Sequence, residues 1–151
     1  MFNGKKKIIL FDNQGVTLGM GKDHNFQELI KDLKQNGHDI GGATYHEELD
    51  DISKENLEDL GIDWKSSNYL LGADKQDHEY FTDYAVWALK YNIEDIVLVD
   101  DGDFYDTTCE ENNPHVQAIN QAGGTGIHFD RNRPHKSVLA TRKKFEELGI
   151  L

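Results

Sequence analysis

The sequence contains little cysteine, little proline and no long apolar run. One cysteine, Cys109, and two prolines occur among its 151 residues. A single cysteine excludes a disulfide within the chain and fits a reducing compartment, where we expect Cys109 to be a structural thiol. No apolar stretch approaches the ~20 residues of a membrane-spanning helix, and no signal-peptide pattern precedes the first apolar segment. We therefore expect a cytoplasmic protein without a membrane partner.

Positive charge is also scarce. The chain has 16 Lys and Arg against 28 Asp and Glu, a formal net charge of −12. Nucleic-acid binding depends on clustered Lys and Arg, so we expect no nucleic-acid partner. The basic triplets at residues 5–7 and 142–144 are typical of solvated element ends. None of the seven histidines forms an HxxxH or HxH pair, and we expect all of them at the surface or in loops: His24, His38, His46, His78, His115, His128 and His135.

The apolar pattern alternates between strands and helices. Two β-branched runs, Lys7–Phe11 and Asp95–Asp100, predict strands buried on both faces. Further strands are expected at Asp39–Tyr45, Tyr69–Leu71 and Gly126–Phe129. Helices are expected at residues 26–33 (capped by Asp23 or Asn25 and stopped by Gly37), 53–60 (capped by Ser53 and closed by Gly61), 77–91, 114–122 and 137–148. This order predicts an α/β protein with a mainly parallel sheet, helices on both faces, and a single domain over residues 1–151.

Polar side chains follow four of the predicted strands. Asp12 ends the first strand and Thr44 lies at the end of the second. Lys75 follows the third, and the pair Asp100 and Asp101 follows the fourth. Ligands of open α/β sheets bind beyond the carboxyl ends of the strands. We therefore expect these five side chains to converge on one edge of the sheet.

These residues lie in segments that resemble the four motifs of the haloacid dehalogenase-like (HAD) hydrolase superfamily. FDNQGVTL (residues 11–18) is similar to its first motif, a strand followed by Asp-x-Asp-Gly, except that Gln14 replaces the second Asp. GGATY (41–45) matches the second motif, and GADKQDHEYF (72–81) matches the third. IVLVDDGDFYD (96–106) matches the acidic fourth motif. The resemblance covers residues 6 to about 130 and implies a three-layer Rossmann-like, HAD-like fold.

The resemblance also implies a chemistry. Asp12 would attack phosphorus and become a transient aspartyl phosphate. Thr44 and Lys75 would bind the phosphoryl oxygens and offset their charge. The resemblance implies Mg²⁺ as cofactor. Its ligands would be Asp12, the backbone carbonyl of Gln14, Asp100 and Asp101, with Asp103 and Asp106 as further candidates in the same loop.

Gln14 is the departure that decides how much of this chemistry survives. In the family's phosphatases the second Asp protonates the leaving group and then activates water, and an amide does neither. Acid–base catalysis of this kind contributes about 10²–10⁴-fold. A phosphatase slowed by this loss, a phosphatase that takes its acid from elsewhere (His46 is the candidate nearest Thr44 in sequence), a dehalogenase, a slow phosphotransferase and a binding module all remain open. Acyl and aryl phosphates would be least affected, because their leaving groups need no proton.

The spacing between motifs leaves no room for a separate cap domain. Residues 13–43 accommodate one helix, and about 30 residues separate Thr44 from Lys75. This disfavours the family's dehalogenases, which enclose small substrates under a cap. An open site suits a phosphoprotein, or a phosphorylated small molecule under a lid from another subunit, which would make the protein a homo-oligomer.

Two other protein classes fit less well. Receiver domains also place Asp, Thr and Lys at strand ends, but their acidic pair follows the first strand and their acceptor the third. A dinucleotide-binding unit would need a third glycine after Gly19 and Gly21. The main alternative to an enzyme is a catalytically degenerate HAD-fold binding or regulatory protein. His128 and residues 131–136 could face the site or a partner, but a solvated connector to the last helix is the preferred expectation.

Overall fold

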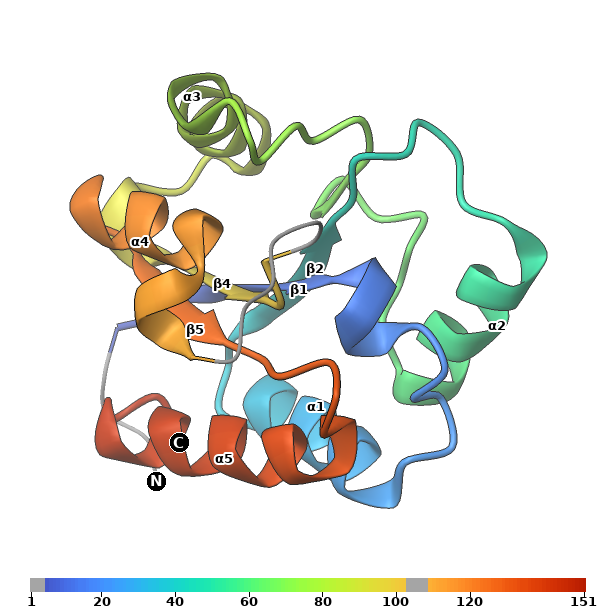
Figure 1. Ribbon diagram of the computed structural model, residues 1–151. Coiled ribbons are helices and arrows are strands. Elements are labelled where there is room, and N and C mark those ends of the chain that lie inside the picture. The colour runs from blue at the N-terminus through green and yellow to red at the C-terminus, as the bar shows by residue number, and fades with distance from the viewer. Residues whose placement is uncertain (1–4, 103–108) are drawn as a thin grey trace.

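A five-stranded sheet forms the centre of the protein. The computed structural model describes residues 5–102 and 109–151, so the candidates Asp103 and Asp106 lie outside the described residues. The strands are β1 (Ile8–Asp12), β2 (Asp39–Ala43), β3 (Tyr69–Leu70), β4 (Ile96–Asp100) and β5 (Thr125–His128). They pair in the order β3-β2-β1-β4-β5, and every pair is parallel (Figure 1). The predicted α/β class with a parallel sheet is confirmed.

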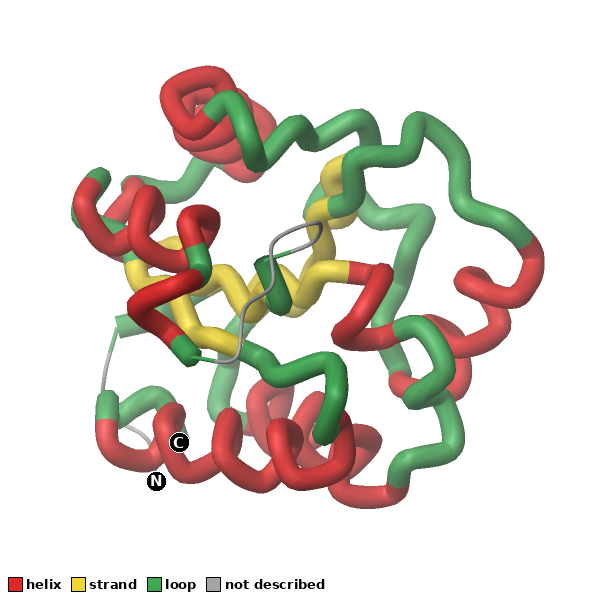
Figure 2. The backbone as a smooth tube through the Cα atoms, viewed as in Figure 1, coloured by secondary structure: helices red, strands yellow, loops and turns green. Residues whose placement is uncertain are grey.

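Helices cover both faces of this sheet (Figure 2). They are α1 (His24–Gln35), α2 (Asp51–Leu60), α3 (His78–Leu89), α4 (Pro114–Gln121) and α5 (Pro134–Glu147). The short turns are η1 (Asn13–Thr17), η2 (Ile93–Asp95) and η3 (Glu110–Asn112). The result is a three-layer Rossmann-like fold. In the described residues no helix combines the length and apolar character of a transmembrane span.

Alternating side chains of the central strands build two cores. Ile9 and Phe11 of β1 pack in a cluster that contains residues of α1, α2 and α5. Ile8 and Leu10 point to the opposite face and pack in a cluster with residues of α3 and α4. All four side chains are at most 1% exposed, as the period of two in a strand requires when both faces are covered.

The start of α2 differs from the prediction. Asp50, not Ser53, is the N-cap, since its carboxylate accepts the backbone N–H of Ser53 at 2.8 Å. Ser53 is buried, and its hydroxyl accepts a hydrogen bond from the side-chain amide of Asn13 at 2.9 Å. A serine at N3 resembles a cap in sequence, but here it holds the turn that follows β1. Of the two candidate caps of α1, Asp23 and Asn25, the structure has Asp23 as the N-cap.

Gly41 and Gly42 do not interrupt β2, although glycine weakens a strand. A Cβ on Gly41 would lie 2.0 Å from the carbonyl oxygen of Asn68, and one on Gly42 would lie 2.2 Å from the ring of Tyr69. The two glycines therefore allow the segment leading into β3 to pack directly against β2.

The expectation that every histidine lies at the surface or in a loop is wrong for His115, which lies in α4 and is 2% exposed. His38 does lie in a loop, between α1 and β2, but it is only 4% exposed. His38 accepts the backbone N–H of Lys7 at Nδ1 (3.0 Å), and its Nε2 lies 2.9 Å from the carbonyl oxygen of Ile150. The ring therefore joins the beginning of β1 to the segment after α5. The basic triplets also make ion pairs: Lys5 and Lys7 both contact the buried carboxylate of Asp95.

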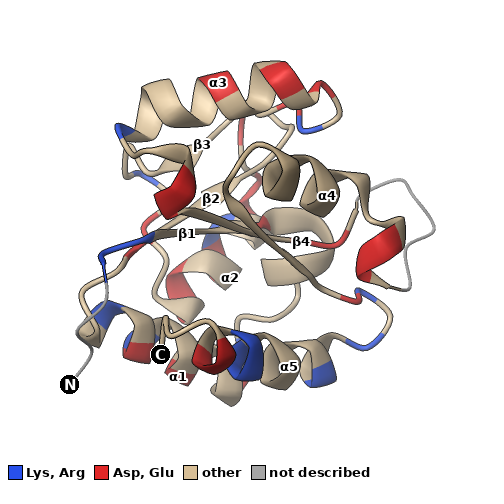
Figure 3. Ribbon diagram, turned by 90° about the vertical axis from the view of Figure 1, so that its left-hand side faces the viewer, with Lys and Arg blue, Asp and Glu red and all other residues tan. Residues whose placement is uncertain are grey.

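Charged residues are spread over the helices and loops that surround the sheet (Figure 3). Lys and Arg are visible on α5 and at the approach to β1, and acidic segments occur on α3 and near α4.

We expect His38→Ala to lower the free energy of unfolding by about 2–4 kcal/mol, because it leaves the Lys7 N–H and the Ile150 carbonyl buried without this partner. Urea denaturation followed by circular dichroism measures the change. His24→Ala is the matched control: His24 is exposed on α1, and its loss should change stability by less than about 0.5 kcal/mol. Equal effects of the two variants would contradict the role of His38 in joining the beginning of β1 to the segment after α5.

Candidate active site

The turn after β1 places Asp12 at the carboxyl edge of the sheet. The Asp12 carboxylate accepts the backbone N–H of Asn13 at 2.9 Å, and the hydroxyl of Thr17 donates to the backbone carbonyl of Asp12 at 3.2 Å. The Leu18 N–H closes the turn on the carbonyl of Asn13 at 2.8 Å. These bonds fix the backbone on both sides of the Asp12 side chain.

Lys75 bridges the two central carboxylates of this edge. Its ammonium lies 2.7 Å from Oδ1 of Asp12 and 2.9 Å from Oδ2 of Asp100, and it donates to the carbonyl oxygen of Ala43 at 3.0 Å. The three charged side chains are 4% exposed or less. Each of these charges requires its partners, because an unpaired ion that is buried away from solvent is strongly unfavourable.

Asp100 is the most enclosed of these carboxylates. Oδ1 accepts the backbone N–H of Gly102 at 2.6 Å and lies 3.0 Å from Nδ1 of His115. Burial alone would raise the pKa of Asp100, but the charge of Lys75 and the hydrogen bond from His115 hold that pKa well below its usual value. Asp100 is therefore ionised at neutral pH.

Asp101 faces the turn that follows Asp12. A Cβ on Gly15, whose φ is +81°, would lie 1.9 Å from Oδ2 of Asp101, so only glycine allows the turn and the carboxylate to approach this closely. Arg131 contacts the same carboxylate from the segment after β5, with Nη1 3.5 Å from Oδ2.

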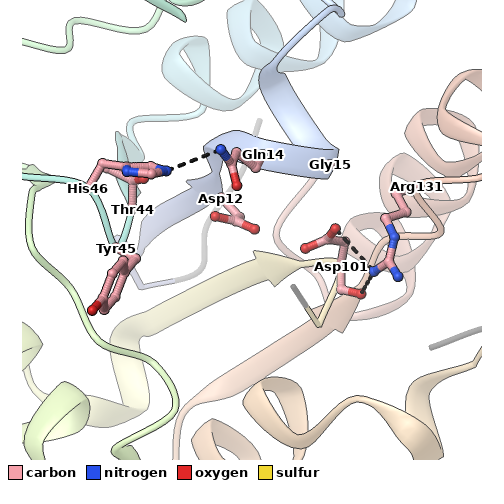
Figure 4. Close-up of a pocket in the computed structure, with 8 residues that line it drawn as sticks. All are labelled: Asp12, Gln14, Gly15, Thr44, Tyr45, His46, Asp101 and Arg131. Atoms are coloured by element: carbon pink, nitrogen blue, oxygen red, sulfur yellow. Dashed lines mark hydrogen bonds and ion pairs between the residues drawn. The ribbon is translucent and has the colours of Figure 1, made fainter. Parts of the chain in front are cut away.

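A pocket of about 510 Å³ opens at this edge. It is lined by Asp12, Gln14, Gly15, Thr44, Tyr45, His46, Asp101 and Arg131. Figure 4 shows Thr44, Tyr45 and His46 on one side of Asp12, and Asp101 and Arg131 on the other. Nε2 of Gln14 lies 3.1 Å from Nε2 of His46. His46, the candidate for an alternative acid because it lies near Thr44 in the sequence, thus contacts Gln14.

Three carboxylates of the site could together hold a cation. Oxygens of Asp12, Asp100 and Asp101 lie within 4.8 Å of one another, and all three residues are buried. Such hard oxygen donors suit Mg²⁺. Lys75 offsets one of their negative charges and Arg131 faces another. A divalent cation would further reduce the repulsion among the three carboxylates. Gln14 borders the same pocket, and its expected role as a carbonyl ligand remains a prediction.

The structure thus brings the sequence-predicted residues to one edge of the sheet. Asp12, Lys75 and Asp100 are in contact, and Thr44 and Asp101 line the same pocket as Asp12. Their proposed catalytic and metal-binding roles remain predictions.

Three residues around this site were not assigned to it from the sequence. For Arg131 a solvated connector was preferred over a position facing the site, but Arg131 lines the pocket. The strand-end rule, applied to the fifth strand, would have indicated it. Asn113 caps α4 and also donates to the carbonyl of Asp100 at 3.0 Å. An Asn before Pro predicts the cap, whereas nothing local predicts that Asn113 or His115 contacts Asp100.

Comparison with known proteins adds support for the fold. No protein-family model matches the chain, and no curated protein is significantly similar to it in sequence. A crystal structure of an uncharacterized protein from Corynebacterium glutamicum ATCC 13032 Kitasato is similar to it, with a TM-score of 0.61. The alignment covers 92% of this chain and 96% of that chain at 20% identity. At this identity the likeness concerns the fold alone.

We expect Lys75→Met to lower the free energy of unfolding by about 3–5 kcal/mol, because it leaves Asp12 and Asp100 buried without their shared counter-ion. Lys22→Met is the matched control, since the Lys22 side chain is 83% exposed in its pair with Asp59, and the change there should stay below about 1 kcal/mol. Denaturant titration with a chelator present measures both. A stable Lys75→Met variant would show that the charge bridge contributes little.

Proposed function

We propose that this protein is a hydrolase of the HAD type, a Mg²⁺-dependent phosphatase or phosphotransferase that acts through an aspartyl phosphate at Asp12. The observation that supports this most is the buried bridge of Lys75 between Asp12 and Asp100, beside a pocket that also contains Thr44. This is the set of residue types that the four HAD motifs supply to phosphoryl transfer.

Each residue would act on the phosphoryl group. A carboxylate oxygen of Asp12 attacks phosphorus, and the bond to the leaving-group oxygen breaks. Lys75 stabilises the charge on the attacking and transferring oxygens, and the Thr44 hydroxyl donates to a phosphoryl oxygen. Bound Mg²⁺, held by Asp12, Asp100, Asp101 and the Gln14 carbonyl, would supply further positive charge to those oxygens. Water then hydrolyses the aspartyl phosphate, or another acceptor takes the phosphoryl group.

Gln14 makes this a slow reaction for substrates whose leaving group needs a proton. Its amide carries no titratable proton, and its Nε2 lies against the His46 ring. The expected substrate is a phosphorylated small molecule or a phosphoprotein, because the spacing of the motifs leaves no room for a cap domain over the site.

The second candidate is a catalytically degenerate binding or regulatory protein of the same fold. Gln14 itself favours it, since loss of the acid–base group is the change that would retain phosphate and cation binding while removing turnover. Both candidates predict Mg²⁺ binding, but only the first predicts a reaction.

Asp12→Asn separates the two candidates. We expect the wild type to hydrolyse an aryl phosphate in the presence of Mg²⁺, and the variant to lose at least about 10³-fold in kcat, because an amide cannot form the covalent intermediate. Release of inorganic phosphate measures the rate. Asp83→Asn, which removes an exposed carboxylate of α3, is the control and should retain full activity. A wild-type rate no higher than that of Asp12→Asn would favour the binding protein.

Gln14→Asp restores the family's acid–base group. We expect it to raise kcat for an alkyl phosphate by about 10²-fold or more, since a proton can then be given to the leaving group. Steady-state kinetics measure the change. Gln14→Asn is the control, because Asn has the shape of Asp but cannot donate a titratable proton. If Gln14→Asp still folds and binds Mg²⁺ but gains no rate, other parts of the machinery are absent.

A further inference from the structure

The leaving group of any phosphoryl transfer here departs without the family's proton donor. Gln14 occupies the position of that donor and lines the pocket, and an amide does not protonate an oxygen at neutral pH. An alkoxide is a poor leaving group without a proton, whereas a phenolate leaves as a stable anion. The chemistry of position 14 therefore selects for leaving groups of low basicity.

The mouth of the pocket carries an aromatic side chain that does not belong to either hydrophobic core. Tyr45 is 63% exposed, yet it lines the pocket (Figure 4). Its ring meets that of His46 edge to face, at 6.3 Å between centroids and 73° between planes. An exposed tyrosine ring offers a planar apolar surface on which another ring can stack.

Backbone hydrogen bonds fix the position of the segment that carries Tyr45. The Thr44 N–H donates to the carbonyl of Leu70 at 3.0 Å. The N–H groups of Ala73 and Gly72 donate to the carbonyls of Thr44 and His46, at 2.8 and 2.9 Å. Tyr45 thus lies between two residues that are hydrogen-bonded to the segment around β3, which limits the conformational entropy lost when a ligand binds.

We propose that the substrate of this site is an aryl phosphate monoester, whose ring packs against Tyr45 while its phosphate meets Asp12, Thr44 and Lys75. The proposal rests on the proposed function and specifies its substrate class. Two independent features favour it: the absence of a proton donor at position 14, and the exposed ring of Tyr45 at the mouth of the pocket. The cavity of about 510 Å³ lies within the size range of small-molecule sites, which hold a ring and a phosphate together.

The reaction balances without a protein acid in its first step. An oxygen of the Asp12 carboxylate forms a bond to phosphorus, the bond from phosphorus to the phenolic oxygen breaks, and the electron pair leaves with the phenolate. The phenolate takes its proton from solvent. Water then attacks phosphorus, the bond to the Asp12 oxygen breaks, and the products are inorganic phosphate and the regenerated carboxylate.

The test compares kcat/KM for phenyl phosphate and ethyl phosphate. We expect the wild type to prefer phenyl phosphate by at least about 10²-fold, the size of the missing acid catalysis. Tyr45→Ala should lower kcat/KM for phenyl phosphate by roughly 3- to 10-fold and leave that for ethyl phosphate unchanged. Tyr45→Phe keeps the ring and should behave as the wild type. Because Tyr45 is exposed, these variants should fold, which their thermal melting checks.

A second series separates the sources of the aryl group. Free tyrosine phosphate and a tyrosine-phosphorylated peptide share the reacting group but differ in size, and a serine-phosphorylated peptide of the same sequence is the control. Faster turnover of the tyrosine-phosphorylated peptide indicates a protein substrate, and faster turnover of the free compound indicates a small molecule. Equal turnover of the two phosphopeptides would overturn the aryl preference.

Failure of this inference is distinct from failure of the proposed function. If the wild type hydrolyses phenyl and ethyl phosphate within about 3-fold of each other, or Tyr45→Ala lowers both rates equally, the aryl preference is wrong. The aspartyl-phosphate mechanism still stands in that case, provided that Asp12→Asn is inactive. If the wild type hydrolyses none of these compounds, both the mechanism and the substrate class are overturned.

Discussion

The ammonium of Lys75, shared between Asp12 and Asp100, is the interaction on which the arrangement of the site depends. Two carboxylates that end adjacent strands of a parallel sheet would repel each other in a buried place. The cation between them, itself tied to the Ala43 carbonyl at 3.0 Å, makes their proximity tolerable. Lys75 therefore holds the carboxyl ends of the three strands β2, β1 and β4 together through contacts with one residue of each.

The order and type of the elements follow from local sequence, because a strand covered on both faces must be apolar throughout. The runs at Ile8–Asp12 and Ile96–Asp100 are of this kind, and the strand-end rule then places Asp12 and Asp100 together. Element ends are less predictable. Ser53 resembles a helix cap because it directly precedes the predicted apolar helix that ends at Gly61, yet the cap is Asp50. The Ser53 hydroxyl instead contacts Asn13, 40 residues earlier, and local sequence does not reveal such a distant partner.

The residues that sequence reasoning missed are those whose partners are distant in the chain. His38 joins Lys7 to Ile150, and His115 reaches Asp100 from the beginning of α4. Both are polar residues that resemble surface histidines until the fold encloses them. Arg131 is different, since it follows β5 at the same edge of the sheet as the other site residues. Its position was within reach of the rule that identified Asp12, Thr44 and Asp100.

The link between Asp100 and α4 has a consequence for how the protein could respond to a ligand. Asn113 holds the Asp100 carbonyl and also caps the first turn of α4, and His115 of that turn contacts the Asp100 carboxylate. A displacement of Asp100 would alter both contacts at once. The amide NMR signals of this turn would then report on the position of Asp100, a residue that is itself fully enclosed.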